Sequence, residues 1–261
     1  MNAAVTTPLD VKLMHMTAGL LLAGFAVMAG VVSVKWVARL PVFDIAGITV
    51  TGDVTHNSVL NLRANVAPRF GGTFFTVDLA QVRAAFEAVP WVRQAVVRRD
   101  FPNRLRVQLQ EHKAVAYWGS EDADKLINSF GEVFEANVGE VEQDMLPRLN
   151  GPEGQSAEVL QMYRTLRPLF DTLELPLEEL ELSDRGSWRA QLESGAELEL
   201  GRGDAPEITA RVQRFLKTVT QVASRYGRRV NALEAADLRH ENGYAIKLRG
   251  VSTTLPGAPK K

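Results

Sequence analysis

Few side chains in this sequence have the type and spacing that catalysis or metal binding requires. The chain contains no cysteine, which excludes disulfides, thiolate nucleophiles and cysteine-ligated zinc. Its four histidines, His15, His56, His112 and His240, form no H-E-x-x-H metal motif. No G-x-S-x-G nucleophile elbow and no P-loop occurs, and "GRGD" at residues 201–204 lacks the third glycine of a dinucleotide fingerprint. The sequence therefore predicts a protein that is not an enzyme and needs no cofactor, metal or small-molecule substrate.

The remaining chemistry is that of binding surfaces, and the last predicted hairpin offers one. The segments "ALEAADLRH" (232–240) and "YAIKLRG" (244–250) flank an Asn242-Gly243 pair, a strong hairpin-turn signal. Because no later segment is expected to pair with the second strand, we expect it at a sheet edge with unpaired backbone N–H and C=O groups. A partner strand could add to that edge, or Lys247 and Arg249 could blunt it against association. The residues alone leave both interpretations open.

A second candidate surface is rich in arginine. Five arginines and two acids lie in "VPWVRQAVVRRDFPNRLRVQLQEH", residues 89–112. Leu105, Val107 and Leu109 alternate with polar residues, a period of two that predicts a strand with one apolar and one wet face. Residues 100–103 supply the turn of a hairpin. We expect the arginines to form the solvent side of a sheet and not a nucleic-acid surface, because no aromatic stacking platform runs among them.

Composition indicates how these surfaces are organised. The chain has 261 residues, of which 46% are hydrophobic and 23% charged, so it can build more than one core. The net charge of −1 gives no overall attraction to nucleic acid or acidic lipid. Residues 35–112 contain ten basic and six acidic residues (+4), whereas residues 113–261 contain 19 and 24 (−5). This asymmetry favours a boundary near residue 112.

Residues 13–34 form an apolar run of 22 residues without any Lys, Arg, Asp or Glu. As a helix it measures about 33 Å, enough to cross a bilayer core of about 30 Å. Lys35 and Trp36 end it with the charge and aromatic ring typical of a membrane interface. A cleaved signal peptide, with a site near Val27-Met28-Ala29, is the competing interpretation. We expect an uncleaved anchor after a short cytoplasmic segment (1–12), with the larger part of the chain on the other side of the membrane.

A linker (35–42) separates this helix from a first predicted domain at residues 43–112. Ile45, Ile48 and Val50 indicate a strand, and "NSVLNLRANVA" (57–67) indicates a helix. Asp78, with Gln81 three residues later, predicts the start of a second helix that Pro90 ends. With the hairpin, the order is β-α-α-β-β, which places two helices on one face of a three-stranded sheet.

A second domain is predicted at residues 113–250, followed by a disordered tail at 251–261. Short alternating strands are expected at "AVAYW", "KLINSFGEVFEA", "LEELEL", "SWRAQLE" and "AELELG". A helix over residues 156–170 should be kinked or broken near Arg167 by Pro168. A longer helix capped by Asp204 should carry an apolar stripe from Ile208 to Tyr226. The predicted fold class is thus α+β: a transmembrane helix, then a β-α-α-β-β domain, then a mixed or antiparallel β domain with two packed helices.

This order of landmarks resembles the FtsQ/DivIB family of bacterial cell-division proteins. The resemblance rests on "GTFFTVD" and the arginine-rich hairpin, which look like that family's POTRA domain. It continues through "AVAYW", "LPRLNGPEG", Ser187-Trp188, "LGRGD" and "DLRHENGYA" in the family's order.

The resemblance implies a non-enzymatic scaffold of the divisome in the bacterial inner membrane at the septum, with its two domains in the periplasm. It implies FtsB and FtsL as partners of the C-terminal domain, and other division proteins as partners of the POTRA domain and the membrane helix. The implied binding residues, on the terminal strand and the turn before it, are Arg239, His240, Asn242, Gly243, Tyr244, Ile246 and Leu248. In this sequence His240 and Leu248 stand where the family pattern has tyrosine and tryptophan. A periplasmic POTRA-type chaperone for outer-membrane proteins is the alternative.

Overall fold

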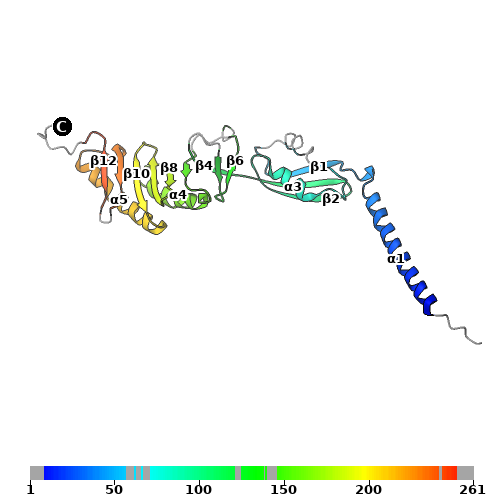
Figure 1. Cartoon of the computed structure of the whole chain (residues 1–261). Helices are drawn as coiled ribbons and strands as arrows, with labels where there is room; N and C mark the ends of the chain where they lie inside the picture. Colours follow the sequence, from blue (N-terminus) through cyan, green and yellow to red (C-terminus); the bar gives the residue numbers. More distant parts are fainter. Residues whose placement is uncertain are drawn as a thin grey trace, which may run out of the picture. The chain divides into compact units, whose positions relative to one another are not determined.

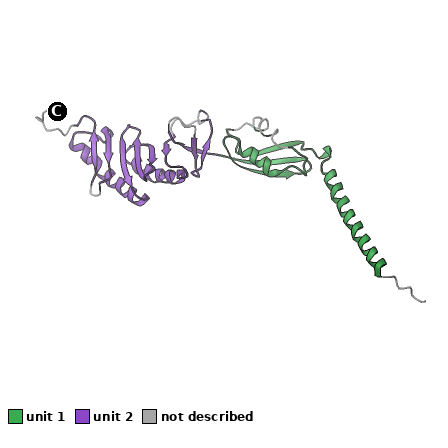
Figure 2. Ribbon diagram, in the orientation of Figure 1, with its two compact units in different colours: residues 1–111 green, residues 112–261 purple. Residues whose placement is uncertain are grey.

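The computed structural model describes residues 9–56, 62, 66, 71–120, 125–137, 139, 146–240 and 243–251. The chain divides into two compact units, residues 1–111 and residues 112–261 (Figure 2). Each unit has its own hydrophobic core, and the two cores share no residue.

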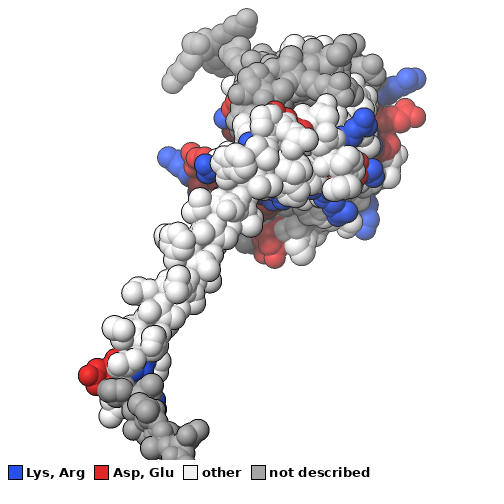
Figure 3. All heavy atoms as spheres, turned by 90° about the vertical axis from the view of Figure 1, so that its right-hand side faces the viewer, with Lys and Arg blue, Asp and Glu red and all other residues white. Residues whose placement is uncertain are grey.

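The chain's first described element is α1 (Leu9–Val37), a helix of 29 residues with no buried residue (Figure 1). It is the one helix in the described part of the chain that is long and apolar enough to cross a membrane. Figure 3 shows its middle as uncharged atoms on the visible face, with charged atoms near its N-terminal end. A helix that is apolar all round and unburied by protein is suited to lipid, because water would solvate it poorly.

The rest of unit 1 is a three-stranded sheet with helical cover. Its strands are β1 (Gly47–Gly52), β2 (Val92–Asp100) and β3 (Arg104–Glu111), and their order is β1-β3-β2. β1 runs parallel to β3, and β2 pairs with β3 as the antiparallel hairpin expected from the alternation. Most of the first predicted helix lies outside the described residues, but Leu62 and Val66 are helical and fully buried.

The helix α3 (Leu79–Glu87) begins where the sequence predicted. The Asp78 carboxylate accepts hydrogen bonds from the backbone N–H groups of Ala80 (2.8 Å) and Gln81 (3.4 Å), which satisfies donors that the first turn leaves unpaired. Val82 and Phe86 on its inner side are buried against Leu105 and Val107 of β3 in one core. The apolar stripe of α3 therefore covers one face of the sheet.

The prediction that the hairpin arginines form one wet face is correct for most of them, but Arg99, although exposed, lies on the other face of the sheet. Arg98, Arg104 and Arg106 are exposed, and Arg98 lies opposite Arg106 across the ladder. Arg99 pairs with the buried Leu105, so its side chain leaves from the helix-covered face. Its guanidinium donates to the backbone carbonyls of residues 74 (2.7 Å), 75 (3.5 Å) and 77 (2.8 Å) and holds the loop before α3.

Unit 2 is built on one nine-stranded sheet of order β12-β11-β10-β9-β8-β7-β4-β5-β6. Its strands are β4 (Ala114–Trp118), β5 (Lys125–Asn128), β6 (Val133–Glu135), β7 (Arg148–Asn150), β8 (Leu177–Leu182), β9 (Ser187–Leu192), β10 (Glu197–Arg202), β11 (Leu233–Asp237) and β12 (Ala245–Leu248). Three neighbouring pairs are parallel, β4–β7, β7–β8 and β10–β11, and the other five are antiparallel. The sheet is mixed, and the α+β class is confirmed.

Two helices, α4 (Ser156–Asp171) and α5 (Ala205–Arg225), pack on each other and on the same side of this sheet. Of the predicted kink or break near Arg167, the break is wrong, because α4 continues to Asp171. Pro168 is exposed in the last turn and costs a hydrogen bond only there. The Asp204 side chain caps α5 by accepting from the Glu207 N–H at 2.9 Å, as predicted. Tyr226 is the C-cap, 54% exposed, and so lies outside the apolar stripe in which the sequence placed it.

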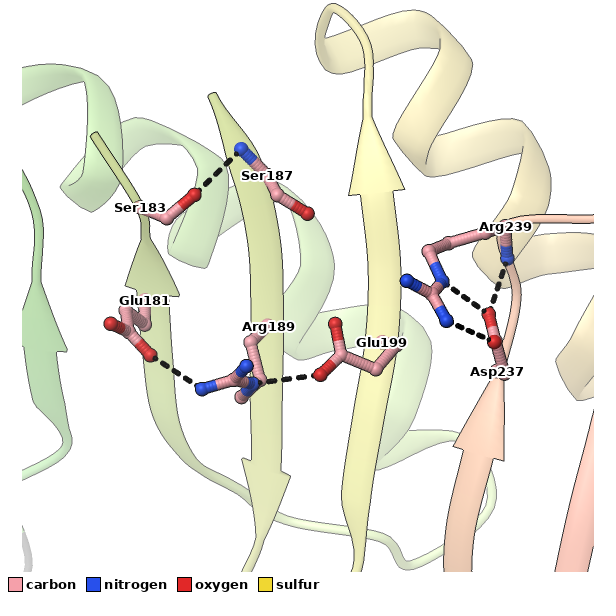
Figure 4. Close-up of polar contacts among 7 residues, drawn as sticks. All are labelled: Glu181, Ser183, Ser187, Arg189, Glu199, Asp237 and Arg239. Carbon is pink, nitrogen blue, oxygen red and sulfur yellow. Dashed lines mark hydrogen bonds and ion pairs between the residues drawn. The ribbon is translucent and has the colours of Figure 1, made fainter. Parts of the chain in front are cut away.

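Alternation along the strands explains the two faces of this sheet. In β8, β9 and β10 the leucines, together with Trp188 and Ala190, are buried toward α4 and α5. The residues between them are mostly charged and lie on the open face. Arg189 bridges two acids there, Glu181 at 3.3 Å and Glu199 at 2.9 Å (Figure 4). The open face is therefore a charged, solvated surface that leads to the edge strand β12.

Candidate protein-binding edge

The terminal strand β12 lies at one edge of the nine-stranded sheet, as expected from its place in the sequence. It pairs antiparallel with β11 through Leu233↔Leu248, Ala235↔Lys247, Ala236↔Ile246 and Asp237↔Ala245. In the part of the chain that the structure describes, no strand pairs with its other side. One row of backbone donors and acceptors is therefore available to an added strand about 4.8 Å away.

The direction of one backbone bond identifies which N–H groups face outward. The N–H of Arg249 donates to the carbonyl of Ala232 at 2.7 Å, on the β11 side. Successive N–H groups of a strand point to opposite edges. The irregularity in this ladder is the extra residue Glu234 in β11, so alternation in β12 is unbroken. The N–H groups of Ile246 and Leu248 consequently point away from β11, toward the open edge.

The side chains of β12 divide between the two faces of the sheet. Leu248 is 5% exposed and lies opposite the fully buried Leu233, so its side chain belongs to the core and not to an outer surface. Ile246 is half-buried against the same core. Lys247 is exposed on the open face, where its ammonium lies 2.8 Å from the Glu234 carboxylate. The hydrogen bond between them raises the pKa of Lys247 and lowers the pKa of Glu234.

Tyr244 ties the start of β12 to the helix layer. Its hydroxyl is 2.8 Å from the Thr218 hydroxyl on α5, and its ring contacts the Phe215 ring edge-on at 5.1 Å between centroids. The ring is half-buried against the core. Such a contact fixes the strand where it leaves the turn, because both an aromatic pair and a hydrogen bond hold one side chain.

Arg239, expected to meet acids of a partner, has an acidic partner within its own chain (Figure 4). Its Nε donates to Asp237 Oδ1 at 2.9 Å and its Nη2 to Oδ2 at 2.6 Å, while the Arg239 backbone N–H also donates to Oδ1 at 3.0 Å. These hydrogen bonds to Arg239 lower the pKa of the Asp237 carboxyl to about 2. The arrangement orients the guanidinium at the end of β11.

The aliphatic part of the Arg239 side chain occupies space that a glycine of the neighbouring strand β10 leaves free. Gly201 lies at a bulge of β10 with a φ of +82°, and a Cβ added to it would stand 2.9 Å from Arg239 Cγ. The sequence, in which "GRGD" was compared only with a dinucleotide fingerprint and a family landmark, did not indicate this role. The spacing of Asp237 and Arg239, two residues apart and thus on one side of an extended segment, was the signal available for their pairing.

The remaining predicted residues lie in the connection between β11 and β12. His240 is exposed, Gly243 is half-buried, and Asn242 lies outside the described residues together with its predicted turn. β11 ends at Asp237 and β12 begins at Ala245, so the ladder stops before the Asn-Gly pair. Those predicted binding residues that the structure describes thus lie at one end of the sheet edge. Some are exposed on its surface, and others are buried in the core beneath it.

The described residues contain no cluster of three or more His, Asp or Glu side chains that could hold a metal ion. A hollow of about 270 Å³ on the open face is lined by Arg148, Glu179 and Glu181 with neighbouring polar groups. Arg148 and Glu179 are 3.6 Å apart there and partly satisfy each other. The arrangement of unit 2 is suited to strand pairing and charged contacts.

Comparison with known proteins gives two family matches that together cover most of the chain beyond α1. Residues 43–112 match the FtsQ-type POTRA domain, and residues 116–239 match the C-terminal domain of the cell-division protein FtsQ/DivIB. The second match ends before β12.

Curated relatives named cell division protein FtsQ match over nearly the whole chain. The relative from Thiomonas arsenitoxydans is 38% identical over 255 residues, which cover 97% of this chain and 92% of the relative. The relative from Bordetella pertussis is 40% identical, covering 91% of this chain and 90% of the relative. The relative from Burkholderia pseudomallei is 37% identical, covering 93% of this chain and 94% of the relative.

Proposed function

The chain belongs to the FtsQ/DivIB family of bacterial cell-division proteins, and from that premise we propose that it is a non-enzymatic scaffold of the divisome. It is a single-pass membrane protein of cell division, anchored by α1. As a scaffold it links FtsB and FtsL, through the C-terminal domain, to other division proteins that contact the POTRA domain and the membrane helix.

The proposed topology places the N-terminus in the cytoplasm and residues 43–250 in the periplasm, at the division septum. Lys12 is the only basic residue before the apolar run in this sequence, so the flanking charges do little to determine the orientation of α1 in the membrane. Long soluble domains translocate largely regardless of such charges, which supports the periplasmic position of both units. The proposed domains are a linker (35–42), the POTRA domain (43–112), the C-terminal domain (113–250) and a tail (251–261).

The proposed mechanism is the addition of a partner strand to β12. The single observation that carries it is the terminal strand's unpaired edge, with the N–H groups of Ile246 and Leu248 directed outward. Main-chain hydrogen bonds to such an edge supply affinity, and neighbouring side chains supply specificity. No turnover is needed, because the function is to hold partners in place.

The proposed binding residues divide into two roles. Arg239, His240, Asn242 and Gly243 contact the partner near the turn. Asp237 uses the Nε–H and one Nη2–H of Arg239, and a guanidinium has five N–H donors, so a partner carboxylate can bind through the others.

Tyr244, Ile246 and Leu248 contribute their backbone groups, while their side chains hold β12 on α5 and the core. This division explains how leucine at position 248 is compatible with binding. A buried side chain there supports the strand whether or not it touches the partner.

The alternative, a periplasmic chaperone for outer-membrane proteins, has no observation in its favour. The full-length family relation and the anchor-like helix α1 both favour the division scaffold.

The decisive experiment measures FtsB and FtsL binding by the full-length protein in nanodiscs, with matched variants at one position. Ile246→Pro removes an outward N–H and leaves the β11 ladder intact, since proline is tolerated at sheet edges. Ile246→Ala removes side-chain packing and keeps the N–H. We expect the proline variant to bind at least about tenfold more weakly than the alanine variant, the equivalent of about 1.4 kcal/mol.

Hydrogen exchange of β11 in both variants checks that the sheet is intact. Tight binding by a folded Ile246→Pro protein would refute strand addition. Arg239→Glu tests the charged part of the proposal, and its binding should fall because the reversed charge repels a partner acid and also breaks the pair with Asp237.

A further inference from the structure

Unit 1 exposes a cluster of apolar side chains at the end where the chain leaves α1. The exposed fractions are 72% for Val42, 50% for Phe75 and 82% for Phe101. The rings form a contact series, with centroid distances of 5.0 Å for Phe43–Phe75, 5.2 Å for Phe74–Phe75 and 6.4 Å for Phe74–Phe101. We call these five residues the aromatic end. Several exposed apolar side chains gathered at one end of a domain are typical of an interaction site.

Hydrogen bonds attach the aromatic end to the residues that directly follow α1. The Thr73 hydroxyl donates to the carbonyl of Ala38 at 2.5 Å, and the Phe74 N–H donates to the carbonyl of Phe43 at 2.7 Å. Ala38 is the first residue after the helix. On the other side, Arg99 donates to the carbonyls of Phe74 and Phe75 and joins the same loop to β2. The aromatic end therefore cannot move far from the end of α1 without breaking these bonds.

The depth of Ala38 relative to a bilayer follows from helix geometry. The uncharged run of α1 ends at Val34, and Ala38 lies four residues later, about 6 Å along the helix axis. The headgroup layer on each side of the hydrocarbon core is about 5 to 7 Å thick. Ala38, and with it the Thr73 side chain, consequently lies at headgroup depth when α1 spans the membrane.

The residues around this level have the chemistry of a membrane interface. Trp36, two residues after the apolar run ends, is 67% exposed, and Lys35 and Arg39 are exposed beside it. Aromatic rings and basic side chains are both favoured at this depth, the first by burial of apolar area and the second by anionic headgroups. Figure 3 shows uncharged atoms continuing from α1 onto the adjoining end of the unit.

We propose that the aromatic end is a second membrane contact, in which Val42, Phe75 and Phe101 insert into the leaflet on the C-terminal side of α1. The ligand is the lipid surface itself. This inference is independent of strand addition at β12 and requires only that α1 spans the bilayer. Its consequence is that the POTRA unit stands end-on at the membrane and does not swing freely on its linker.

The absence of cysteine from the sequence allows single-cysteine spin labelling of the full-length protein. Labels are placed at Phe75→Cys and Phe101→Cys in nanodiscs of phosphatidylethanolamine and phosphatidylglycerol. Leu21→Cys within α1 is the lipid reference. Gln94→Cys is the matched control, since Gln94 is exposed on the same strand as Arg99 and five residues farther from the turn. The measurement compares accessibility to oxygen, which partitions into lipid, with accessibility to a water-soluble nickel chelate.

We expect the oxygen-to-nickel ratio at positions 75 and 101 to be several-fold higher than at position 94 and close to the lipid reference. Water-like ratios at 75 and 101 would overturn the proposal and leave the aromatic end to a protein partner. Lipid-like ratios at 94 as well would also overturn it, because the sheet would then lie flat on the bilayer. Circular dichroism of each labelled protein checks that the fold is intact. The Phe101→Cys substitution should leave it unchanged, because the Phe101 side chain is highly exposed.

Discussion

Replacing Leu248 by alanine should loosen the terminal strand before it changes any contact with a partner. Leu248 is 5% exposed and packs in the core opposite Leu233. The substitution removes three carbon atoms, worth about 0.8 kcal/mol each on burial, or about 2.4 kcal/mol together. A cavity term adds to this cost in a rigid core. At a sheet edge the strand can partly collapse into the space, so we expect about 2.5 kcal/mol.

This energy predicts a rate that hydrogen exchange can measure. Because 1.4 kcal/mol corresponds to a factor of ten, backbone amides of β12 and its partner β11 should exchange about 60-fold faster in Leu248→Ala when they exchange through local opening. Binding of a partner strand should weaken by up to a similar factor, since the partner must first restore the strand. Lys247→Ala is the matched control, because its ion pair with Glu234 is exposed and such pairs contribute little.

One result would refute this reasoning. If Leu248→Ala exchanged at the wild-type rate and yet lost binding, the leucine would be a direct surface contact and its assignment to the core would be wrong. If Lys247→Ala accelerated exchange as much as Leu248→Ala, strand stability would depend on the surface charges and not on the buried face.

Three further predictions concern stability. The pKa of the Asp237 carboxyl is about 2, below its usual value near 4, so the stabilisation that it provides is present above pH 4 and lost as the pH falls to 2. In urea unfolding, the free energy of unfolding of Asp237→Asn should therefore change less between pH 4 and pH 2 than that of the wild type. Gly52→Ala should destabilise unit 1 by at least about 2 kcal/mol, because the φ of Gly52 is +100° and the added Cβ would meet the β3 backbone. A Cβ added at Gly47 meets no atom, so Gly47→Ala should change thermal stability by less than about 0.5 kcal/mol. Arg99→Met should lower the free energy of unfolding of unit 1, measured by hydrogen exchange, by about 1 to 2 kcal/mol, because it breaks the bonds to the loop carbonyls. Arg98→Met, on the wet face, should be nearly neutral. Equal effects of the two substitutions would contradict the assignment of the two faces.

Local patterns were sufficient for the elements of this fold. The apolar run of α1, the caps at Asp78 and Asp204, and the alternation in β3 each act over a few neighbouring residues, and the structure has each of them. The pairing of β12 with β11 was also predictable, because the two alternating segments flank an Asn-Gly pair.

Long-range pairing was beyond the reach of the same patterns. β7 lies between β4 and β8 and is parallel to both, although α4 separates β7 from β8 in the chain. Three residues such as those of β7 have too little periodicity to specify their neighbours. The helix α4 likewise tolerates Pro168, because the lost hydrogen bond falls in the last turn and the core holds the helix.

The candidate binding edge divides in the same way. From the sequence alone came the residues of the edge, the absence of a catalytic motif and the likeness to a division scaffold. Only the tertiary structure decided that Leu248 is buried, that Tyr244 is held by α5, that Asp237 binds Arg239, and that Arg99 leaves the wet face. Alternation fixes that neighbouring side chains lie on opposite faces, but contacts between distant segments determine which face is covered.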